Sequence, residues 1–140
     1  MTTKEYLSQI GRYNRMINNR LVELAQIKEL ACSISAIKSG ERVNTSPDPD
    51  KMSTTYAKID EMERTIDKLI DEYVDKKSLI IRQIEGMENN DYYEILFSRY
   101  IEELTFEKIA DKTIWCRRQI HRIHAKALKA FEDKYGSEYL

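Results

Sequence analysis

The sequence predicts an all-α protein in which a long antiparallel helical hairpin precedes a C-terminal helix-turn-helix domain. The 140 residues include only four glycines and two prolines, so few positions interrupt a helix. Apolar residues recur every three or four positions along two segments of about 35 residues each. Six of the 23 basic residues, and none of the 24 acidic ones, lie between Lys112 and Phe131.

The first predicted helix covers about residues 3–39. Its apolar residues fall on one stripe of a helix that turns about 100° per residue. They are Tyr6, Ile10, Tyr13, Ile17, Leu21, Leu24, Ile27, Ala31 and Ile34. The polar segment that follows, residues 39–53 ("SGERVNTSPDPDKMS"), contains a glycine and both prolines. It therefore predicts a flexible connection.

The second predicted helix covers about residues 53–87 and has an apolar stripe of its own. This stripe consists of Ile59, Met62, Ile66, Leu69, Tyr73, Ile80, Ile84 and Met87. Two helices of equal length fold back as a coiled-coil-like hairpin, residues 1–88, that buries the stripes against each other. A two-helix hairpin leaves one side uncovered, so we expect the C-terminal domain or a second subunit to cover it. We predict a homo-oligomer formed through these helices; the alternative is a structural spacer without a site of its own.

Residues 89–140 form the second predicted domain, which contains three further helices. Asn90 or Asp91 is a good N-cap for the first helix, whose inner face carries Ile95, Leu96 and Tyr100. Thr105 caps the second helix, whose inner face carries Phe106, Ile109 and Ala110. The third helix begins near Cys116, and its inward residues are Ile120, Ile123, Ala127, Leu128 and Phe131.

The last two of these helices are joined by a turn of a few residues, which is typical of a helix-turn-helix unit. Ala110 is a small residue where the helices approach, and Trp115 is a large apolar plug for the turn. The basic residues lie on the face opposite the apolar one when about 100° is taken per residue. The pattern therefore predicts a recognition helix at about residues 116–131 that enters the major groove of DNA.

The stretch "LTFEKIADKTIWCRRQIHRIHAKALKAF", residues 104–131, resembles the promoter-reading helix-turn-helix of sigma factor region 4, including "AKAL" at residues 125–128. The preceding "ILFSRYIEE" resembles the helix that leads into that unit. Together with its long helical N-terminal half, the chain resembles the small phage-encoded, sigma-like transcriptional regulators of the ArpU/RinA type. These regulators occur in prophages of Gram-positive bacteria and are associated with late-gene control. The specific match covers roughly the last 45 residues.

The resemblance implies a sequence-specific transcriptional regulator that binds double-stranded DNA, with RNA polymerase as a further candidate partner. The residues expected to contact DNA are Arg117, Arg118, His121, Arg122, Lys126, Lys129 and Thr105. Ile114 stands where the sigma pattern often has glycine, so a left-handed backbone there would be strained. Cys116 occupies the usual Ser/Thr cap position and is a weaker cap. Because Arg118 replaces a common acid, the promoter sequence read by sigma factors is not carried over.

A second class of function is a non-enzymatic helical adaptor whose basic helix binds an acidic protein surface or RNA polymerase. A true sigma subunit is disfavoured because no segment resembles the promoter-melting or core-clamp regions. We expect no enzymatic activity and no cofactor, because the chain has no glycine-rich phosphate loop, nucleophile elbow or metal cluster. His121, His124 and Cys116 lack a fourth metal ligand, and we expect His124 to be a packed, hydrogen-bonded residue.

The sequence also bears on the cellular compartment. The longest apolar run is far shorter than the ~18 residues that span a bilayer, so no membrane partner is expected. Cys32 and Cys116 lie far apart and match no metal-binding spacing. We interpret them as free thiols in the reducing cytoplasm of a bacterial host cell.

Overall fold

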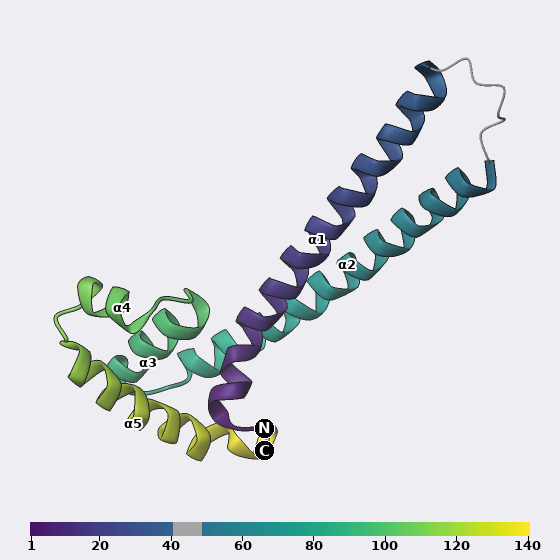
Figure 1. Ribbon diagram of the computed structural model, residues 1–140. Helices are drawn as coiled ribbons and strands as arrows, with labels where there is room; N and C mark the ends of the chain where they lie inside the picture. The colour runs from purple at the N-terminus through teal and green to yellow at the C-terminus, as the bar shows by residue number, and fades with distance from the viewer. Residues whose placement is uncertain (41–48) are drawn as a thin grey trace. The chain divides into compact units, whose positions relative to one another are not determined.

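The computed structural model describes the backbone of residues 1–40 and 49–140 and the side chains of residues 1–33 and 52–140. These residues confirm the predicted all-α class. The main helices are α1 (Thr3–Gly40), α2 (Pro49–Glu85), α3 (Asn90–Leu96), α4 (Phe106–Lys112) and α5 (Arg117–Tyr135) (Figure 1). A π-helical turn, η1 (Phe97–Ile101), follows α3, and a 3-10 turn, η2 (Gly136–Glu138), follows α5. No helix in the described part is both long and apolar enough to cross a bilayer.

The described residues divide into two compact units. Unit 1 consists of Met1–Asn14 and Tyr73–Leu140, and unit 2 consists of Arg15–Glu72. Each long helix therefore contributes one part to each unit. The predicted division into domains at residues 88 and 89 stays a prediction, and we describe the two units separately.

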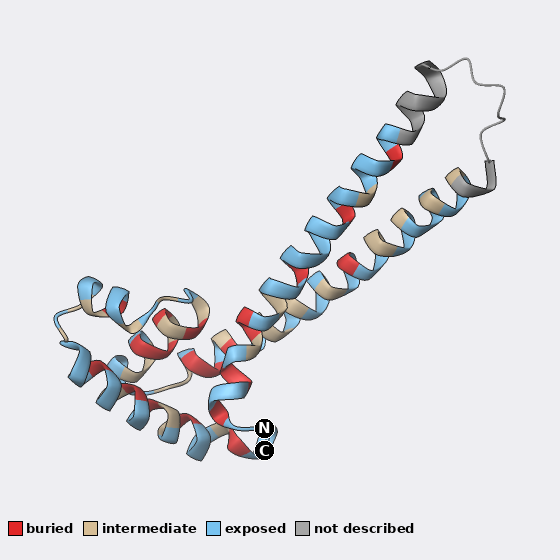
Figure 2. Cartoon of the chain, in the orientation of Figure 1, coloured by how far each residue is buried: buried red, intermediate tan, exposed pale blue. Residues whose placement is uncertain are grey.

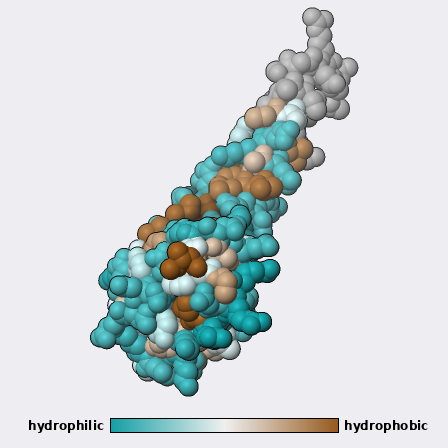
Figure 3. All heavy atoms as spheres, turned by 90° about the vertical axis from the view of Figure 1, so that its left-hand side faces the viewer, coloured by the Kyte–Doolittle hydropathy of each residue, from teal (hydrophilic) through white to brown (hydrophobic). Residues whose placement is uncertain are grey.

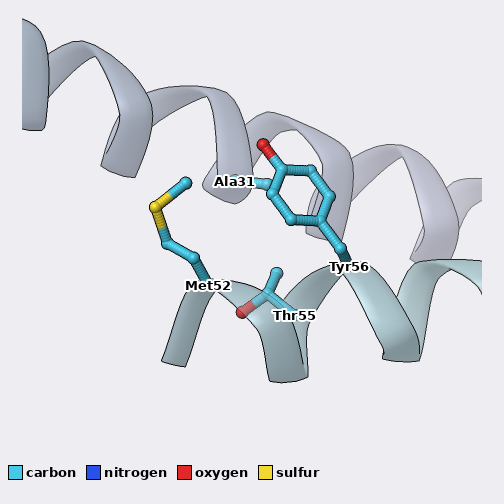
Figure 4. A pocket seen from close by; sticks show the side chains of 4 residues that line it. All are labelled: Ala31, Met52, Thr55 and Tyr56. Carbon is cyan, nitrogen blue, oxygen red and sulfur yellow. The ribbon is translucent and has the colours of Figure 1, made fainter. Parts of the chain in front are cut away.

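Unit 2 is the antiparallel pairing of α1 and α2. Lys28 Nζ lies 2.9 Å from Glu63 Oε1 across the two helices. The buried side chains follow the predicted stripes (Figure 2): Ile17, Leu24, Ala31 and Ile66. Near Ala31 the small side chain leaves a shallow pocket that Met52, Thr55 and Tyr56 line from α2 (Figure 4).

The structure differs from the hairpin prediction at Leu21 and at the start of α2. Leu21 was placed in the buried stripe, but it is 44% exposed. It lies about 60° around the helix from Leu24, beyond the line where two helices touch. Ile34 and residues 41–48 of the predicted connection lie outside the described side chains and backbone. The connection is shorter than predicted because α2 already begins at Pro49, where the fixed φ of proline suits a first helical residue.

Unit 1 has one hydrophobic core, to which the start of α1, the end of α2, α3, α4 and α5 all contribute. Its members are Tyr6, Leu7, Ile10, Ile80, Ile84, Ile95, Leu96, Tyr100, Ile109, Ile120, Ala127 and Phe131. Most of these positions follow from the helical period of the sequence. Leu7 does not: it is next to Tyr6 on the chain, yet it is fully buried because several helices surround this end of α1.

The entry into the C-terminal helices differs in detail from the prediction. The N-cap of α3 is Asn89, which precedes both predicted positions, Asn90 and Asp91, and its Oδ1 accepts a hydrogen bond from Asp91 N at 2.9 Å. A single helix was expected here, but after Leu96 the chain changes to π geometry, in which Glu102 N donates to Phe97 O at 3.0 Å. The chain then turns at Glu103, whose φ of 57° is left-handed. That turn sets the direction in which α4 starts.

The C-terminal segment packs on the start of α1 within unit 1. The ring of Tyr139 stacks on the ring of Tyr6 at a centroid distance of 4.2 Å. The hydroxyls of Tyr139 and Thr3 are 2.7 Å apart. Tyr6 OH also donates to Gln83 Oε1 at 2.7 Å, and Gln83 Nε2 donates to Glu138 Oε2 at 2.5 Å. Both ends of the described chain are thus held to the same core.

Candidate nucleic-acid interface

Thr105 begins the candidate interface by capping α4, as predicted. Its Oγ1 accepts a hydrogen bond from Lys108 N at 3.2 Å. At the other end of α4, Thr113 takes an extended backbone, and both its N and its Oγ1 donate to Ile109 O, at 3.0 and 2.7 Å. These bonds satisfy backbone groups that a helix end leaves unpaired. They fix where α4 starts and stops.

The turn between α4 and α5 is less strained than the sequence suggested. Among the described residues, Glu103 is the only non-glycine with a positive φ, so Ile114 does not carry the expected left-handed backbone. Cys116 takes the extended N-cap conformation, and its backbone N donates to Gln119 Oε1 at 3.1 Å. Gln119 reaches back in this way as in a capping box, which offsets the weak capping ability of cysteine. Gln119 is therefore a structural residue of this helix start.

The inner face of α5 is buried as the sequence predicts. Ile120, Ala127 and Phe131 are all 0% exposed. Trp115 and Ala110 pack against the same core while remaining partly exposed. This agrees with a plug under the turn and a small residue between the helices. Apolar contacts with the core thus hold α4, the turn and α5 in place.

Six of the seven residues predicted to contact DNA belong to α5, and the structure exposes all six. They are Arg117, Arg118, His121, Arg122, Lys126 and Lys129. Arg118, Arg122 and Lys129 lie about 160–200° around the helix from Ile120. Figure 2 shows the resulting alternation of buried and exposed residues along α5. Burying the apolar side fixes the direction in which the cationic side projects.

Two contacts modify the expected charge pattern. No acid neighbours the arginines in sequence, but Glu107 Oε1 of α4 lies 3.9 Å from Arg117 Nη1. Both side chains are largely exposed, and a pair of this kind is weak and screened by salt. Lys112 is not part of the basic face of α5, because its Nζ donates to Glu102 Oε1 at 2.9 Å and to Ser98 Oγ at 3.1 Å. The basic face therefore begins at Arg117.

The two histidines of α5 have different environments. His121 is exposed, and its ring lies 4.5 Å from the Phe106 ring between centroids. His124 is only 7% exposed, and its Nε2 lies 2.7 Å from Tyr100 OH. Burial, with a smaller effect of nearby positive charges, lowers the pKa of His124 to about 4. His124 is therefore neutral at pH 7, and its packed, hydrogen-bonded role is confirmed.

In the described part of the chain, no three His, Cys, Asp or Glu side chains come together around a common point. Cys32 and Cys116 are free and exposed.

Arg99 is a supporting residue that the sequence did not single out. Its guanidinium lies 4.6 Å from the centroid of the Phe106 ring, and its Nη1 donates to Leu104 O at 3.0 Å. A cation over an aromatic face is attracted by the ring quadrupole. Arg99 thus ties the π-helical turn to the start of α4. Periodicity gave no signal for this contact, because it depends on the left-handed turn at Glu103.

Fold and site together define an all-α protein in which α5 follows α4 after a short turn and has a buried apolar face and an exposed basic face. A family model described as "Protein of unknown function (DUF1492)" matches residues 33–132, which is more than half of the chain. The chain belongs to this family. No curated protein and no solved structure matches it.

Proposed function

We propose that this protein is a sequence-specific double-stranded DNA-binding transcriptional regulator whose helix α5 enters the major groove. The observation that carries the proposal is the exposure of Arg118, Arg122 and Lys129 directly opposite the buried face of α5. The resemblance to sigma region 4 and to the ArpU/RinA-type regulators extends the proposal to phage or prophage late genes. The family itself adds no function to this argument.

The geometry of α5 suits a groove because the helix is anchored from one side only. Arg118 and Arg122 are four residues apart and therefore follow one another along one side of the helix. An arginine can bond O6 and N7 of guanine with two hydrogen bonds, and lysines such as Lys126 and Lys129 can neutralise phosphates. The arginines would then supply sequence discrimination, and the lysines would supply position and affinity.

The test begins with DNA that the wild-type protein selects from a random pool. Fluorescence anisotropy should show a log–log salt slope of about −3 to −4, as expected for three to five phosphate contacts. Replacing Arg118→Ala and Arg122→Ala together should lower affinity by at least about 30-fold, since each good guanine pair is worth about 1–3 kcal/mol. Both side chains are exposed, so circular dichroism should still report a helical protein.

The matched control removes the same charge elsewhere in unit 1. Arg12→Ala with Arg82→Ala replaces two exposed arginines outside α5 and should leave affinity within about threefold. If the α5 double variant binds as tightly as the wild type, the proposal fails.

An adaptor that binds an acidic protein surface or RNA polymerase through the same face remains the second candidate. DNA binding at moderate salt concentration distinguishes it from a DNA-binding regulator. An adaptor should ignore DNA at about 150 mM salt, where charges are screened over about 8 Å. Sedimentation velocity with and without the selected duplex distinguishes the two. A complex at that salt concentration supports the DNA-binding proposal.

We also propose that two copies associate through unit 2, because one DNA module with so few phosphate contacts binds weakly. Lys28 and Glu63 touch across the antiparallel helices. Leu21 precedes Lys28 by seven residues, or about two turns, on α1. Ile70 follows Glu63 by the same number on α2, so both residues lie on the same side of the hairpin as the ion pair. These two side chains are 44% and 38% exposed. Helical spacing places these two side chains beside a pair of opposite charges, and we call the two residues the apolar strip.

The other side of the hairpin carries more charge. A groove there is lined by four charged residues of both helices, with Thr65, Met62 and Ile66 between them: Arg20, Glu23, Lys58 and Glu61. The strip with Leu21 and Ile70 is self-complementary under a two-fold axis, because the lysine of one copy can face the glutamate of the other. A second copy of this chain is therefore the occupant we propose.

Sedimentation equilibrium tests this association. Leu21→Lys with Ile70→Lys should shift the protein to monomers, because it puts like charges into the strip. Val22→Lys with Leu30→Lys is the control: both residues are 58% exposed but point more than about 100° away from the contact line of α1. A wild-type protein that remains monomeric at about 100 µM, far above a stable dimer's dissociation constant, would contradict the proposal.

A further inference from the structure

Ile114, in the turn between α4 and α5, is 98% exposed and is the most exposed large hydrophobic residue among those described. On the face drawn in Figure 3, small hydrophobic areas lie among hydrophilic side chains. A single exposed apolar residue is ordinary on a protein surface. Its place in the turn is what makes this residue informative.

The backbone on both sides of Ile114 is held in place. Thr113 is bonded to Ile109 O through its N and its Oγ1. Trp115 packs against the core, and Cys116 N donates to Gln119 Oε1. A residue between such anchors is held out at a fixed position.

Nothing within the described molecule favours isoleucine at this position. Its φ is not positive, so the turn does not demand an unusual residue. A β-branched side chain has no preference for a turn, where Gly, Asn, Asp and Ser are usual. At 98% exposure the side chain gains almost no burial energy. The side chain is therefore free to contact a partner without losing any contact of its own.

We propose that Ile114 contacts the 5-methyl group of a thymine beside the bases that face α5, an inference that rests on the proposed function. The thymine methyl is the apolar group that base pairs present in the major groove, and apolar side chains contact it. Ile114 lies just before Arg117 and Arg118, at the end of α5 that reads bases in helix-turn-helix proteins. An apolar protein surface docked here would strip water from both guanidinium groups, whereas DNA offers them acceptors.

The experiment removes the methyl group without changing base pairing. In the DNA selected by the wild-type protein, each thymine is replaced in turn by deoxyuridine, and binding is measured by anisotropy. At one thymine position in each bound site, the wild type should lose about fourfold in affinity, as expected for one buried methyl group. Ile114→Ala should bind the thymine and deoxyuridine duplexes equally, and Ile114→Val should keep most of the difference.

Leu140→Ala serves as the control, because Leu140 is also an exposed apolar residue, at 67%, but lies outside the helix-turn-helix. It should keep the full fourfold difference. If the wild type binds its selected DNA but no deoxyuridine substitution matters, this inference is overturned while the proposed function stands. If Ile114→Ala still binds the thymine duplex about fourfold more tightly than the deoxyuridine duplex, the inference is overturned in the same way. If no DNA is selected at all, the proposed function fails and this inference fails with it.

Discussion

The same two long helices form a tight core in unit 1 and a thin one in unit 2. In unit 1, Ile80 and Ile84 of α2 are 0% exposed because α1, α3 and α5 contribute to the same core. In unit 2, the buried residues Ile17, Leu24 and Ile66 keep 4–8% exposure, since the two helices have only each other within that unit. An apolar repeat therefore marks which side of a helix is buried, and the number of packing partners sets how completely.

The largest expected effect compares one substitution in both units. Ile84→Ala in unit 1 should lower the free energy of unfolding by about 4 kcal/mol, because a tight core relaxes little around the cavity. Ile66→Ala in unit 2 should cost about 2 kcal/mol, the low end of the range for this change. Urea denaturation followed by circular dichroism measures both. Equal losses would show that the two cores are equally tight and would break the comparison.

The second largest effect concerns the buried hydrogen bond between Tyr100 and His124 in unit 1, which has no counterpart among the described contacts of unit 2 that we compare. Tyr100→Phe leaves His124 Nε2 without the hydroxyl that lies 2.7 Å away. Leaving a buried polar group unsatisfied costs about 1–3 kcal/mol. Tyr73→Phe removes the hydroxyl of a half-buried tyrosine in the same unit, which accepts a hydrogen bond from Lys77 Nζ at 3.3 Å, and should cost less than about 1 kcal/mol. Urea denaturation measures the free energy of unfolding of both variants. Equal losses would contradict a stabilising hydrogen bond between Tyr100 and His124.

The same contact predicts a pH dependence. Burial lowers the pKa of His124 from 6.5 to about 4, so the unfolded chain binds this proton more readily than the folded one. The contribution to stability is complete above pH 6.5 and is lost as the pH falls from 6.5 towards 4. Unfolding experiments at pH 7, 5.5 and 4.5 should show a steeper loss for the wild type than for His124→Gln. Carboxylates titrate in both proteins, so parallel curves would refute the role of His124.

The smallest expected effect lies in unit 2. The Lys28–Glu63 pair joins side chains that are 53% and 46% exposed, and such pairs contribute about 0.2–1 kcal/mol. Glu63→Ala should therefore lower the free energy of unfolding by less than 1 kcal/mol, and the loss should shrink in 1 M salt. Glu61→Ala, an exposed acid on the other side of α2, is the control. A loss above 2 kcal/mol would show that unit 2 depends on this pair.

Much of the fold was readable from the sequence because its helices are amphipathic. The stripe of α5 predicts which side is buried, and the absence of acids between Lys112 and Phe131 predicts which side is basic. Thr105 was a reliable cap because a hydroxyl can bond the free N–H groups of a helix start. These features depend on residues close together in the chain.

The rest could not be predicted because it depends on residues that are far apart or on an unusual backbone. Leu21 matches the helical period but lies outside the line of contact with α2. Glu107 approaches Arg117 only because α4 and α5 pack at a particular angle. The left-handed turn at Glu103 and the stacking of Tyr139 on Tyr6 have no local sequence signal.

The division of labour across α5 has a consequence for how such a chain can diversify. Ile120 and Phe131 hold the scaffold, and the hydrogen bond between His124 and Tyr100 adds a directional restraint on how the helix is rotated. Exposed positions such as Arg118 and Arg122 carry little of the folding free energy. Substitutions at these exposed positions can therefore change the surface that α5 presents, while the buried residues keep the fold. Such substitutions should change the free energy of unfolding very little.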